Sequence, residues 1–363
     1  MAPFTLKWGI VATGGIAEQF IKDLIADPAL RGVSDVAHLP VAVASRSVEK
    51  AQAFIDAQVP ADLRSKVTPY GSYEELYKDP AVDVVYVASP SAFHYKNSLD
   101  ALRAGKNVLC EKPFTVNAKQ AKHLQHVAKE SNLFLMEAVW TRFFPLVKTF
   151  TKLLHEDKVI GRVHRVFSDF SVWFDPKTRP TYYDPNTGGG ALLDLGVYMN
   201  LWTLLTCYHH PDNKLSPPDV IKAVQFRSAV NRGVDESTSV ITSWEKPQIV
   251  CIGTASMMID TPPECVVRVQ GTKGQIIIPI HGSRPEKILV RLDDGATREY
   301  NFPIPGQGLF WEADAVARDI RDGKKEEALY PLSESVFAME LMDEIRRQNE
   351  LVFPANVEYC EDF

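Results

Sequence analysis

Two short segments of the sequence hold side chains that could hold or move a proton. Lys112 lies in a Glu-Lys-Pro sequence directly after a short apolar run. Asp194 and Tyr198 follow the glycine run 188–190 and are four residues apart, so they would share one face of a helix. A lysine, a carboxylate and a phenol are groups that general acid–base catalysis uses. Lys112, Asp194 and Tyr198 therefore have side chains of the types that such chemistry needs.

A glycine-containing turn near the start of the chain could bind a dinucleotide. The apolar run 6–13 ends at two glycines, and apolar residues then recur with helical spacing. Alanines at 12 and 17 stand at the first and third glycine positions of a G-x-G-x-x-G turn. Gly14 allows the backbone to approach a pyrophosphate at the helix N-terminus, where N–H groups attract anions. The cofactor contacts expected here are Thr13, Gly14, Gly15 and Ile16. The alternative is a strand–turn–helix that binds nothing.

The end of the next predicted strand bears on the choice between NAD and NADP. An NAD site usually places a carboxylate there, where it holds the ribose 2′-hydroxyl. This chain instead has Ser45 and Arg46, with Lys50 one helical turn later. A hydroxyl and a guanidinium suit a 2′-phosphate, and no carboxylate is present to repel it. The sequence therefore favours NADP, with a solvated arginine at a helix start as the alternative.

Alternating strand and helix patterns would position these residues within domain 1–140. Short apolar runs bounded by turn residues predict strands at 6–13, 39–45, 83–88, 107–110 and 134–137. Amphipathic spacing predicts helices at 16–24, 48–57, 94–104 and 118–131. Repeated β-α-β units with short connections imply a parallel, doubly wound sheet. The first domain is therefore predicted to be a Rossmann dinucleotide-binding domain.

The pattern changes after residue 140. A helix at 146–156 precedes longer alternating strands, each with one apolar and one polar face. These strands are predicted at 166–174, 221–230, 237–244, 248–257, 265–269, 275–280 and 287–292, with a helical interruption at 190–205. Two helices, 311–322 and 333–348, close the chain. The second domain, 141–363, is therefore predicted to be α+β, built on a large, mostly antiparallel open sheet.

Composition and charge argue against several other classes of protein. The 45% hydrophobic and 24% charged residues are those of a soluble globular protein, and 363 residues usually make two domains. A net charge of −6 with scattered basic residues argues against a nucleic-acid partner. Five dispersed cysteines argue against a disulfide framework, and no Cys/His spacing suits a metal. Without a signal peptide or a run of about 18 apolar residues, the expectation is a cytoplasmic protein with no membrane partner.

Several segments, taken in order, resemble the glucose–fructose oxidoreductase/inositol dehydrogenase (Gfo/Idh/MocA) family over nearly the whole chain. They are Trp-Gly-Ile-Val at 8–11, Ala-Ser-Pro-Ser-Ala-Phe-His at 88–94, Glu-Lys-Pro at 111–113, Met-Glu-Ala-Val-Trp-Thr-Arg-Phe-Phe-Pro at 136–145, the glycine-rich segment 188–198 and the closing helices. Within this family the chain is most similar to the NADP-dependent xylose dehydrogenase and dimeric dihydrodiol dehydrogenase branch. Tyr198 points to that branch, since many relatives carry histidine there.

The resemblance implies roles for individual residues. Lys112 and Tyr198 would be the catalytic pair. The residues that would lie along the cofactor are Ser89, Pro90, His94, Glu111 and Pro113, with Trp140 and Arg142 near the nicotinamide. The resemblance also implies a homodimer formed through the open face of the C-terminal sheet.

Elementary chemistry agrees with these roles. Hydride leaves a carbinol carbon for nicotinamide only as the hydroxyl proton is removed, so a base must touch that oxygen. A phenol has an ordinary pKa of about 10, which a nearby ammonium lowers. Tyr198 is therefore the candidate base, Lys112 its electrostatic modulator, and Asp194 an acceptor that orients a neighbouring hydroxyl.

Three functions follow as hypotheses. The first is NADP-dependent oxidation of the C1 hydroxyl of an aldopentose, D-xylose to its lactone. The second is trans-dihydrodiol oxidation, because both substrates present vicinal hydroxyls on a six-membered ring. The third, from another class, is a non-catalytic NADP-sensing regulator on the same fold, since fold does not fix function.

Overall fold

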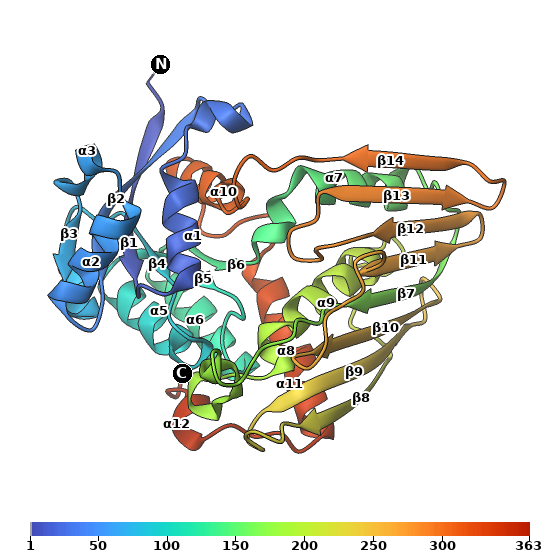
Figure 1. Cartoon of the computed structure of the whole chain (residues 1–363). Helices are drawn as coiled ribbons and strands as arrows, with labels where there is room; N and C mark the ends of the chain where they lie inside the picture. Colours follow the sequence, from blue (N-terminus) through green and yellow to red (C-terminus); the bar gives the residue numbers. More distant parts are fainter. Residues whose placement is uncertain (1) are drawn as a thin grey trace. The chain divides into compact units, whose positions relative to one another are not determined.

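The computed structural model describes residues 2–363, which divide into two compact units (Figure 1). The first unit contains the residues up to Phe143 together with Ile304–Met339 and Glu358–Phe363, and the second contains Phe144–Pro303 and Glu340–Val357. The sequence-based boundary after residue 140 placed both late segments in the second domain. The structure packs them with the first unit. Helical periodicity shows that a helix has an apolar face, but it does not identify the sheet that buries that face.

The first unit is built on a six-stranded parallel sheet in the order β3-β2-β1-β4-β5-β6. Its strands are β1 (Phe4–Val11), β2 (Val36–Ala44), β3 (Thr68–Tyr70), β4 (Val84–Val87), β5 (Asn107–Glu111) and β6 (Leu135–Ala138). Its main helices are α1 (Gly15–Leu24), α2 (Val48–Gln58), α4 (Tyr73–Lys78), α5 (His94–Arg103), α6 (Ala118–Glu130) and α10 (Phe310–Arg321), with α3 (Ala61–Arg64) a single turn. This doubly wound order confirms the predicted Rossmann fold, and it sets the carboxyl ends of the strands along one edge.

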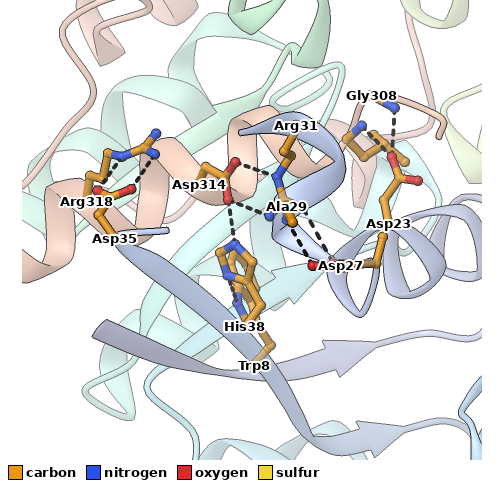
Figure 2. Close-up of polar contacts among 12 residues, drawn as sticks. Trp8, Asp23, Asp27, Ala29, Arg31, Asp35, His38, Gly308, Asp314 and Arg318 are labelled. Carbon is orange, nitrogen blue, oxygen red and sulfur yellow. Dashed lines mark hydrogen bonds and ion pairs between the residues drawn. The ribbon is translucent and has the colours of Figure 1, made fainter. Parts of the chain in front are cut away.

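Helix α10 arrives late in the sequence and is fixed to the first unit by two buried carboxylates (Figure 2). Asp23, at the end of α1, accepts the backbone N–H groups of Gln307, Gly308 and Leu309 at 2.7–2.9 Å, which fixes the turn that leads into α10. Asp314 accepts two hydrogen bonds of 2.8 Å from the Arg31 guanidinium. Both side chains of this ion pair are 1% exposed.

Asp314 also holds His38 in a defined tautomer. The indole N–H of Trp8 can only donate, and it points at Nδ1 of His38 at 3.2 Å. The ring proton must therefore lie on Nε2, which donates to Asp314 at 2.9 Å. Burial lowers the pKa of His38, in agreement with a neutral ring. Figure 2 shows this chain of contacts running from β1 and β2 to α10.

The last residues of the chain lie on α5 and α6. Gln120 donates to the carbonyl oxygen of Tyr359 at 2.8 Å, and the Tyr95 hydroxyl accepts the N–H of Glu361 at 3.1 Å. The Phe363 ring stacks on His123 with centroids 4.6 Å apart. The C-terminal segment is therefore an integral part of the first unit.

The second unit is built on an eight-stranded sheet in the order β14-β13-β12-β11-β7-β10-β9-β8. The strands are β7 (Val163–Asp169), β8 (Val220–Arg227), β9 (Asp235–Trp244), β10 (Ile249–Ser256), β11 (Val267–Gly271), β12 (Gly274–Ile278), β13 (Lys287–Leu292) and β14 (Thr297–Asn301). Only β7 and β10 pair in parallel among these described strands. The prediction of a large, mostly antiparallel sheet is confirmed.

The sequence patterns missed or misplaced some strands. Edge strand β14, with the sequence Thr-Arg-Glu-Tyr-Asn, is mostly charged and polar, a composition typical of protected sheet edges. Edge strand β3 has only three residues. Strand β7 ends at Asp169, five residues before the predicted end, although Phe170 and Val172 still donate backbone hydrogen bonds beside β10. The apolar alternation there reflects packing against a buried cluster around Tyr183 and Met257.

The second unit also contains α7 (Pro145–Thr151), α8 (Ala191–Asp194) and α9 (Gly196–Thr203). Helices α7 and α9 each continue into a π-helical turn. Helix α11 (Leu332–Gln348) and the short α12 (Ala355–Glu358) carry the chain between the units. The stretch Pro185–Tyr208 is long and apolar enough to span a membrane. Since 94% of its most apolar window is buried inside the protein, it has the properties of a core helix.

Candidate active site

The turn between β1 and α1 leaves open space beside a helix N-terminus. Gly14 is the N-cap of α1 and has no side-chain cap. Both Gly14 and Gly15 are exposed, and a Cβ built on either would meet no protein atom within 4 Å. Ala12 has a φ of 75°, the left-handed region that the glycine of the usual fingerprint adopts without strain. The turn therefore keeps the glycine-type conformation with an alanine, and free N–H groups of α1 face room for an anion.

The end of β2 lies beside this turn. The hydroxyl oxygens of Thr13 and Ser45 are 3.1 Å apart, and Ser45 is buried. Ser47 caps α2 by accepting the N–H of Lys50. The side chains of Arg46 and Lys50 are exposed, and neither makes an ion pair with any residue in the range 2–363. A hydroxyl and two cations with no carboxylate partner fit a phosphate group at this position.

The end of β4 is held by side-chain contacts with α5. Ser89 is buried and its hydroxyl accepts from the Asn97 amide at 2.9 Å. Pro90 is exposed and precedes a turn of 3₁₀ helix. The His94 ring is 1% exposed, with Nε2 lying 2.7 Å from the Ser89 carbonyl oxygen and Nδ1 lying 2.7 Å from the Pro113 carbonyl oxygen. Burial lowers the pKa of His94 to about 4, although both carbonyls favour the protonated ring.

The end of β5 presents the Glu-Lys-Pro segment. Glu111 is buried; it accepts the Tyr86 hydroxyl at 2.5 Å and the backbone N–H of Lys112 at 3.1 Å. Burial raises the pKa of Glu111, while the Tyr86 hydrogen bond and the Lys112 charge oppose that shift. The Lys112 side chain is half-buried, and it directly follows Glu111, whose carboxylate is oriented by the two hydrogen bonds from Tyr86 and the Lys112 N–H.

Sequence reasoning gave Glu137 no role, yet it is one of the most constrained groups here. It lies in β6, beside β5, and its carboxylate accepts the N–H of Phe114 at 2.9 Å. Burial raises the pKa of Glu137 to about 7, with Ser335 and Tyr330 favouring the charged form. A glutamate in the middle of the apolar run 134–138 was the available signal, because a charge in a buried strand requires a partner.

Trp140 and Arg142 lie in a 3₁₀ helix, Trp140–Phe143, just after β6. Arg142 is 7% exposed, forms an ion pair with Glu334 at 3.1 Å and donates to the carbonyl oxygen of Leu329 at 2.5 Å. Its guanidinium also lies 5.1 Å from the centre of the Tyr330 ring. The described contacts of Arg142 are thus with the segment before and within α11.

The second unit carries Asp194 and Tyr198. Asp194 ends α8 and is half-buried, and Tyr198 lies in α9 with 6% of its surface exposed. The Tyr198 ring is 4.7 Å from that of Phe170. The buried carboxylate of Asp235 accepts the N–H of Leu192 at 2.9 Å and so fixes the start of α8.

The glycine run before these helices has a structural reason. Gly190 has a φ of 123°, and a Cβ there would lie 2.5 Å from an Asp235 carboxylate oxygen. A Cβ on Gly189 would lie 2.5 Å from the Tyr182 carbonyl oxygen. Only glycine fits both positions, which allows α8 to begin against Asp235.

The parallel sheet brings most of the proposed cofactor residues to one edge. Gly14, Ser45, Ser89, Lys112 and Trp140 each follow the carboxyl end of a different strand, β1, β2, β4, β5 and β6. Ligands bind at this edge in doubly wound sheets. In the part of the chain that the structure describes, no group of three His, Cys, Asp or Glu side chains is arranged to hold a metal ion.

Comparison with known proteins gives family matches to both units. Residues 6–139 match the oxidoreductase family with an NAD-binding Rossmann fold, and residues 150–277 match the Gfo/Idh/MocA C-terminal domain. The chain is 43% identical to the D-xylose 1-dehydrogenase (NADP(+)) of Hypocrea jecorina, over 97% of this chain and 94% of that protein. It is 34% identical to the trans-1,2-dihydrobenzene-1,2-diol dehydrogenase of Danio rerio, over 96% and 98%.

Solved structures agree on the fold. A 3-ketoreductase from Actinomadura kijaniata, in complex with NADP and TDP-benzene, has a TM-score of 0.79 at 23% identity and covers 95% of this chain and 98% of its own. An aldose–aldose oxidoreductase from Caulobacter crescentus has a TM-score of 0.78 at 21% identity, over 95% and 98%. With both units matched and full-length relatives above 30% identity, this chain is a member of the Gfo/Idh/MocA oxidoreductase family.

Proposed function

We propose that this enzyme oxidises the C1 hydroxyl of a cyclic aldopentose, D-xylose in the first instance, to the lactone with NADP⁺ as hydride acceptor. The single observation that carries the substrate is the 43% identity to an NADP-dependent D-xylose 1-dehydrogenase along almost the entire length of both chains. Differences in length or domain content, which often separate activities within a family, are small here.

The residues of the first unit fit NADP. Gly14 and Gly15 leave room for a pyrophosphate at the start of α1, and Ser45, Arg46 and Lys50 would hold the 2′-phosphate. When bound, the nicotinamide supplies the hydride acceptor. Thr13 and Ile16 would line the same turn, and Ser89, Pro90, His94, Glu111, Trp140 and Arg142 are proposed for the nicotinamide half.

Proton transfer is assigned to the chain's own side chains. Tyr198 would remove the C1 hydroxyl proton, because hydride departure requires an oxygen that becomes a carbonyl. A phenol is a weak base near neutral pH, so Lys112 is proposed to lower its pKa through its positive charge. Asp194 would accept a hydrogen bond from a neighbouring sugar hydroxyl and so orient the ring.

A second candidate is oxidation of a trans-dihydrodiol. The observation in its favour is 34% identity to a dihydrodiol dehydrogenase, again along nearly the full length of both chains. The aromatic side chains Phe170, Phe174 and Tyr182 of the second unit would suit an arene or a sugar face equally. The carbinol chemistry required of Tyr198 is the same for both substrates.

The test is a substrate panel with purified protein. D-xylose, other aldoses and a trans-benzene dihydrodiol are each assayed with NADP⁺ and NAD⁺, and kcat/KM is compared. The proposal expects the largest kcat/KM with D-xylose and NADP⁺. A larger value with the dihydrodiol would favour the second candidate. Tight NADP binding without reduction on any substrate would instead indicate a nucleotide-sensing regulator.

A homodimer formed through the outer face of the second sheet is also proposed. Val224 and Phe226 of β8 are 57% and 66% exposed, and Ile241 of β9 and Val250 of β10 are 50% and 40% exposed. The strand registers place these side chains on the same face. An apolar patch of this kind marks an interaction surface. Light scattering should give twice the chain mass, and Phe226→Glu should give a monomer; a monomeric wild type would contradict the proposal.

A cytoplasmic location is proposed as well. Four of the five cysteines are buried as free thiols and the fifth is partly buried, the state expected of a protein in a reducing compartment. Fractionation of cells that express the protein would test this, and recovery in a secreted fraction would contradict it.

A further inference from the structure

One peptide group directly after Lys112 is held at both ends by buried ionisable side chains. The carbonyl oxygen of the Pro113–Phe114 peptide lies 2.7 Å from Nδ1 of His94. The N–H of the same peptide donates to the Glu137 carboxylate at 2.9 Å. His94 comes from α5 and Glu137 from β6, so the two side chains reach this peptide from different elements. Since a carbonyl oxygen only accepts, Nδ1 must carry the proton when this contact is a hydrogen bond.

The neighbouring polar groups of the backbone are also held. The N–H of Lys112 donates to Glu111, whose other carboxylate oxygen accepts from Tyr86. The carbonyl oxygen of Phe114 accepts a weak bond from the Cys110 thiol at 3.6 Å. The main chain on both sides of Lys112 is therefore fixed, and the Lys112 side chain projects from a rigid base. His94 and Glu137 are 1% and 3% exposed, so neither presents its polar atoms to solvent.

Other ionisable and polar groups act on His94 and Glu137. Lys112 acts on His94 by repulsion, and Glu111 acts on Glu137 by repulsion. Ser335 and Tyr330 favour the ionised form of Glu137. A donor at one end of a peptide and an acceptor at the other polarise it in the same direction, which strengthens both hydrogen bonds.

We propose that His94 and Glu137 are positioning residues that fix the direction of Lys112 by holding the two ends of the Pro113–Phe114 peptide. This inference rests on the proposed function, in which Lys112 lowers the pKa of Tyr198. Neither residue touches the reacting atoms in this scheme. Their effect on catalysis passes through Lys112.

The His94 ring allows a matched pair of substitutions. The asparagine amide nitrogen in His94→Asn takes the place of Nδ1 and keeps a donor for Pro113. The glutamine amide nitrogen in His94→Gln takes the place of Nε2 and keeps a donor for Ser89 instead. The proposal expects His94→Gln to lose about ten-fold or more in kcat and His94→Asn to lose clearly less. The same order is expected of Glu137→Leu and Glu137→Gln, because glutamine retains an acceptor for Phe114.

The pH profile separates positioning from general loss of structure. Tyr198 acts as a base, so kcat rises with pH as its phenol ionises. Moving a positive charge away raises the phenol pKa, so the rising limb should move up by about 0.5 to 1 pH unit in His94→Gln and Glu137→Leu. In Glu137→Leu, which alters no proposed cofactor contact, KM for NADP⁺ and the affinity for NADPH should stay within about three-fold. The control is His123→Gln. His123 is a buried histidine on α6 that contacts Tyr95 rather than this peptide, so its substitution should leave the rising limb of the pH profile in place.

Lys112→Ala distinguishes the two ways of failing. If that substitution leaves kcat and the limb unchanged, the proposed role of Lys112 is wrong, and the positioning role falls with it. If it moves the limb while His94→Gln and Glu137→Leu do not, only the positioning role is overturned. In Lys112→Ala/His94→Gln the proposal expects kcat no lower than in Lys112→Ala alone. Independent losses that multiply would indicate a merely structural effect. A rise in NADP⁺ KM with kcat and the limb unchanged in His94→Gln would mean that His94 acts only on cofactor binding and does not position Lys112.

Discussion

The hydroxyl groups of Thr13 and Ser45 are joined at 3.1 Å, which ties the glycine turn after β1 to the end of β2. The proposed pyrophosphate site and the proposed 2′-phosphate site of the cofactor are therefore linked by a side-chain contact. This link holds the α1 N-terminus beside the start of the Arg46 segment. A dinucleotide bound there would meet both anion sites in a preorganised arrangement.

Arg46→Ala should reduce selectivity for NADP⁺. A charge-assisted contact to phosphate contributes about 1.5–3 kcal/mol, so KM for NADP⁺ should rise about 10- to 100-fold while KM for NAD⁺ changes little. Steady-state kinetics with both cofactors measure this. Lys66→Ala, which removes an exposed positive charge elsewhere in the first unit, is the control. Equal losses with both cofactors would place Arg46 outside the 2′-phosphate site.

Tyr198→Phe should lose most of its turnover. Removal of a general base costs about 10²- to 10⁴-fold in kcat, while the packing of the ring against Phe170 is retained. NADPH binding, followed by nicotinamide fluorescence, should be nearly unchanged. Tyr183→Phe is a matched control, because the Tyr183 hydroxyl donates to the Phe174 carbonyl oxygen in the core of the same unit. Turnover near the wild-type value would show that another group removes the proton.

Asp314→Asn should destabilise the protein strongly. It leaves the Arg31 guanidinium, 1% exposed, with a neutral partner, and removing one member of a buried ion pair typically costs about 3–5 kcal/mol. Urea unfolding gives the change in free energy. The exposed Asp35, which pairs with Arg318 and Arg321, provides the contrast. Asp35→Asn should cost no more than about 1 kcal/mol, and equal costs would mean that burial does not decide the strength of these pairs.

Glu312→Gln should stabilise the protein at alkaline pH. Glu312 is fully buried, and neither carboxyl oxygen has a hydrogen-bond partner among residues 2–363. Burial raises the pKa of Glu312 well above its ordinary value, with Glu111 and Asp23 adding repulsion. The folded state thus prefers the neutral acid. That preference is fully present below the ordinary pKa of a glutamate and is lost as pH rises through the raised value.

Thermal unfolding from pH 5 to pH 9 measures this effect. The wild type should lose stability toward high pH, and Glu312→Gln should lose less, with a difference of about 1–3 kcal/mol at the alkaline end. Glu340→Gln, an exposed glutamate of α11, should follow the wild type. Parallel curves for wild type and Glu312→Gln would mean that Glu312 is ionised in the folded protein at all these pH values.

The fold was largely predictable because its signals are local. The apolar runs and amphipathic helices of the first unit gave its doubly wound sheet, and the alternating strands gave the open antiparallel sheet. What remained hidden depends on distant parts of the chain. Nothing in the sequence near Arg31 or His38 indicates that Asp314 binds both side chains. The partners of a buried ion pair can lie at any separation in the sequence, so no spacing pattern identifies them.

The candidate site divides in the same way. Gly14, Arg46 and Lys112 could be found from their place after strands and from motif spacing. Glu137 was visible as a charge in an apolar strand, but its partner, the Phe114 N–H, is a backbone group that every residue carries. The glycine run before Asp194 was visible in the sequence, but the reason for it was not, because Gly189 and Gly190 pack against Tyr182 and Asp235 from distant segments.

The interrupted course of the first unit has a consequence for synthesis of the chain. Arg31 and Asp23 leave the ribosome long before Asp314 and Gly308, and residues Phe144–Pro303 of the second unit lie between them in the sequence. Until residues 307–314 are synthesised, the Asp23 carboxylate and the Arg31 guanidinium lack these partners. The first unit therefore cannot complete its fold as its early segments emerge, although domains generally fold as units during synthesis. Residues Glu358–Phe363, which contact α5 and α6, are added to the first unit later still.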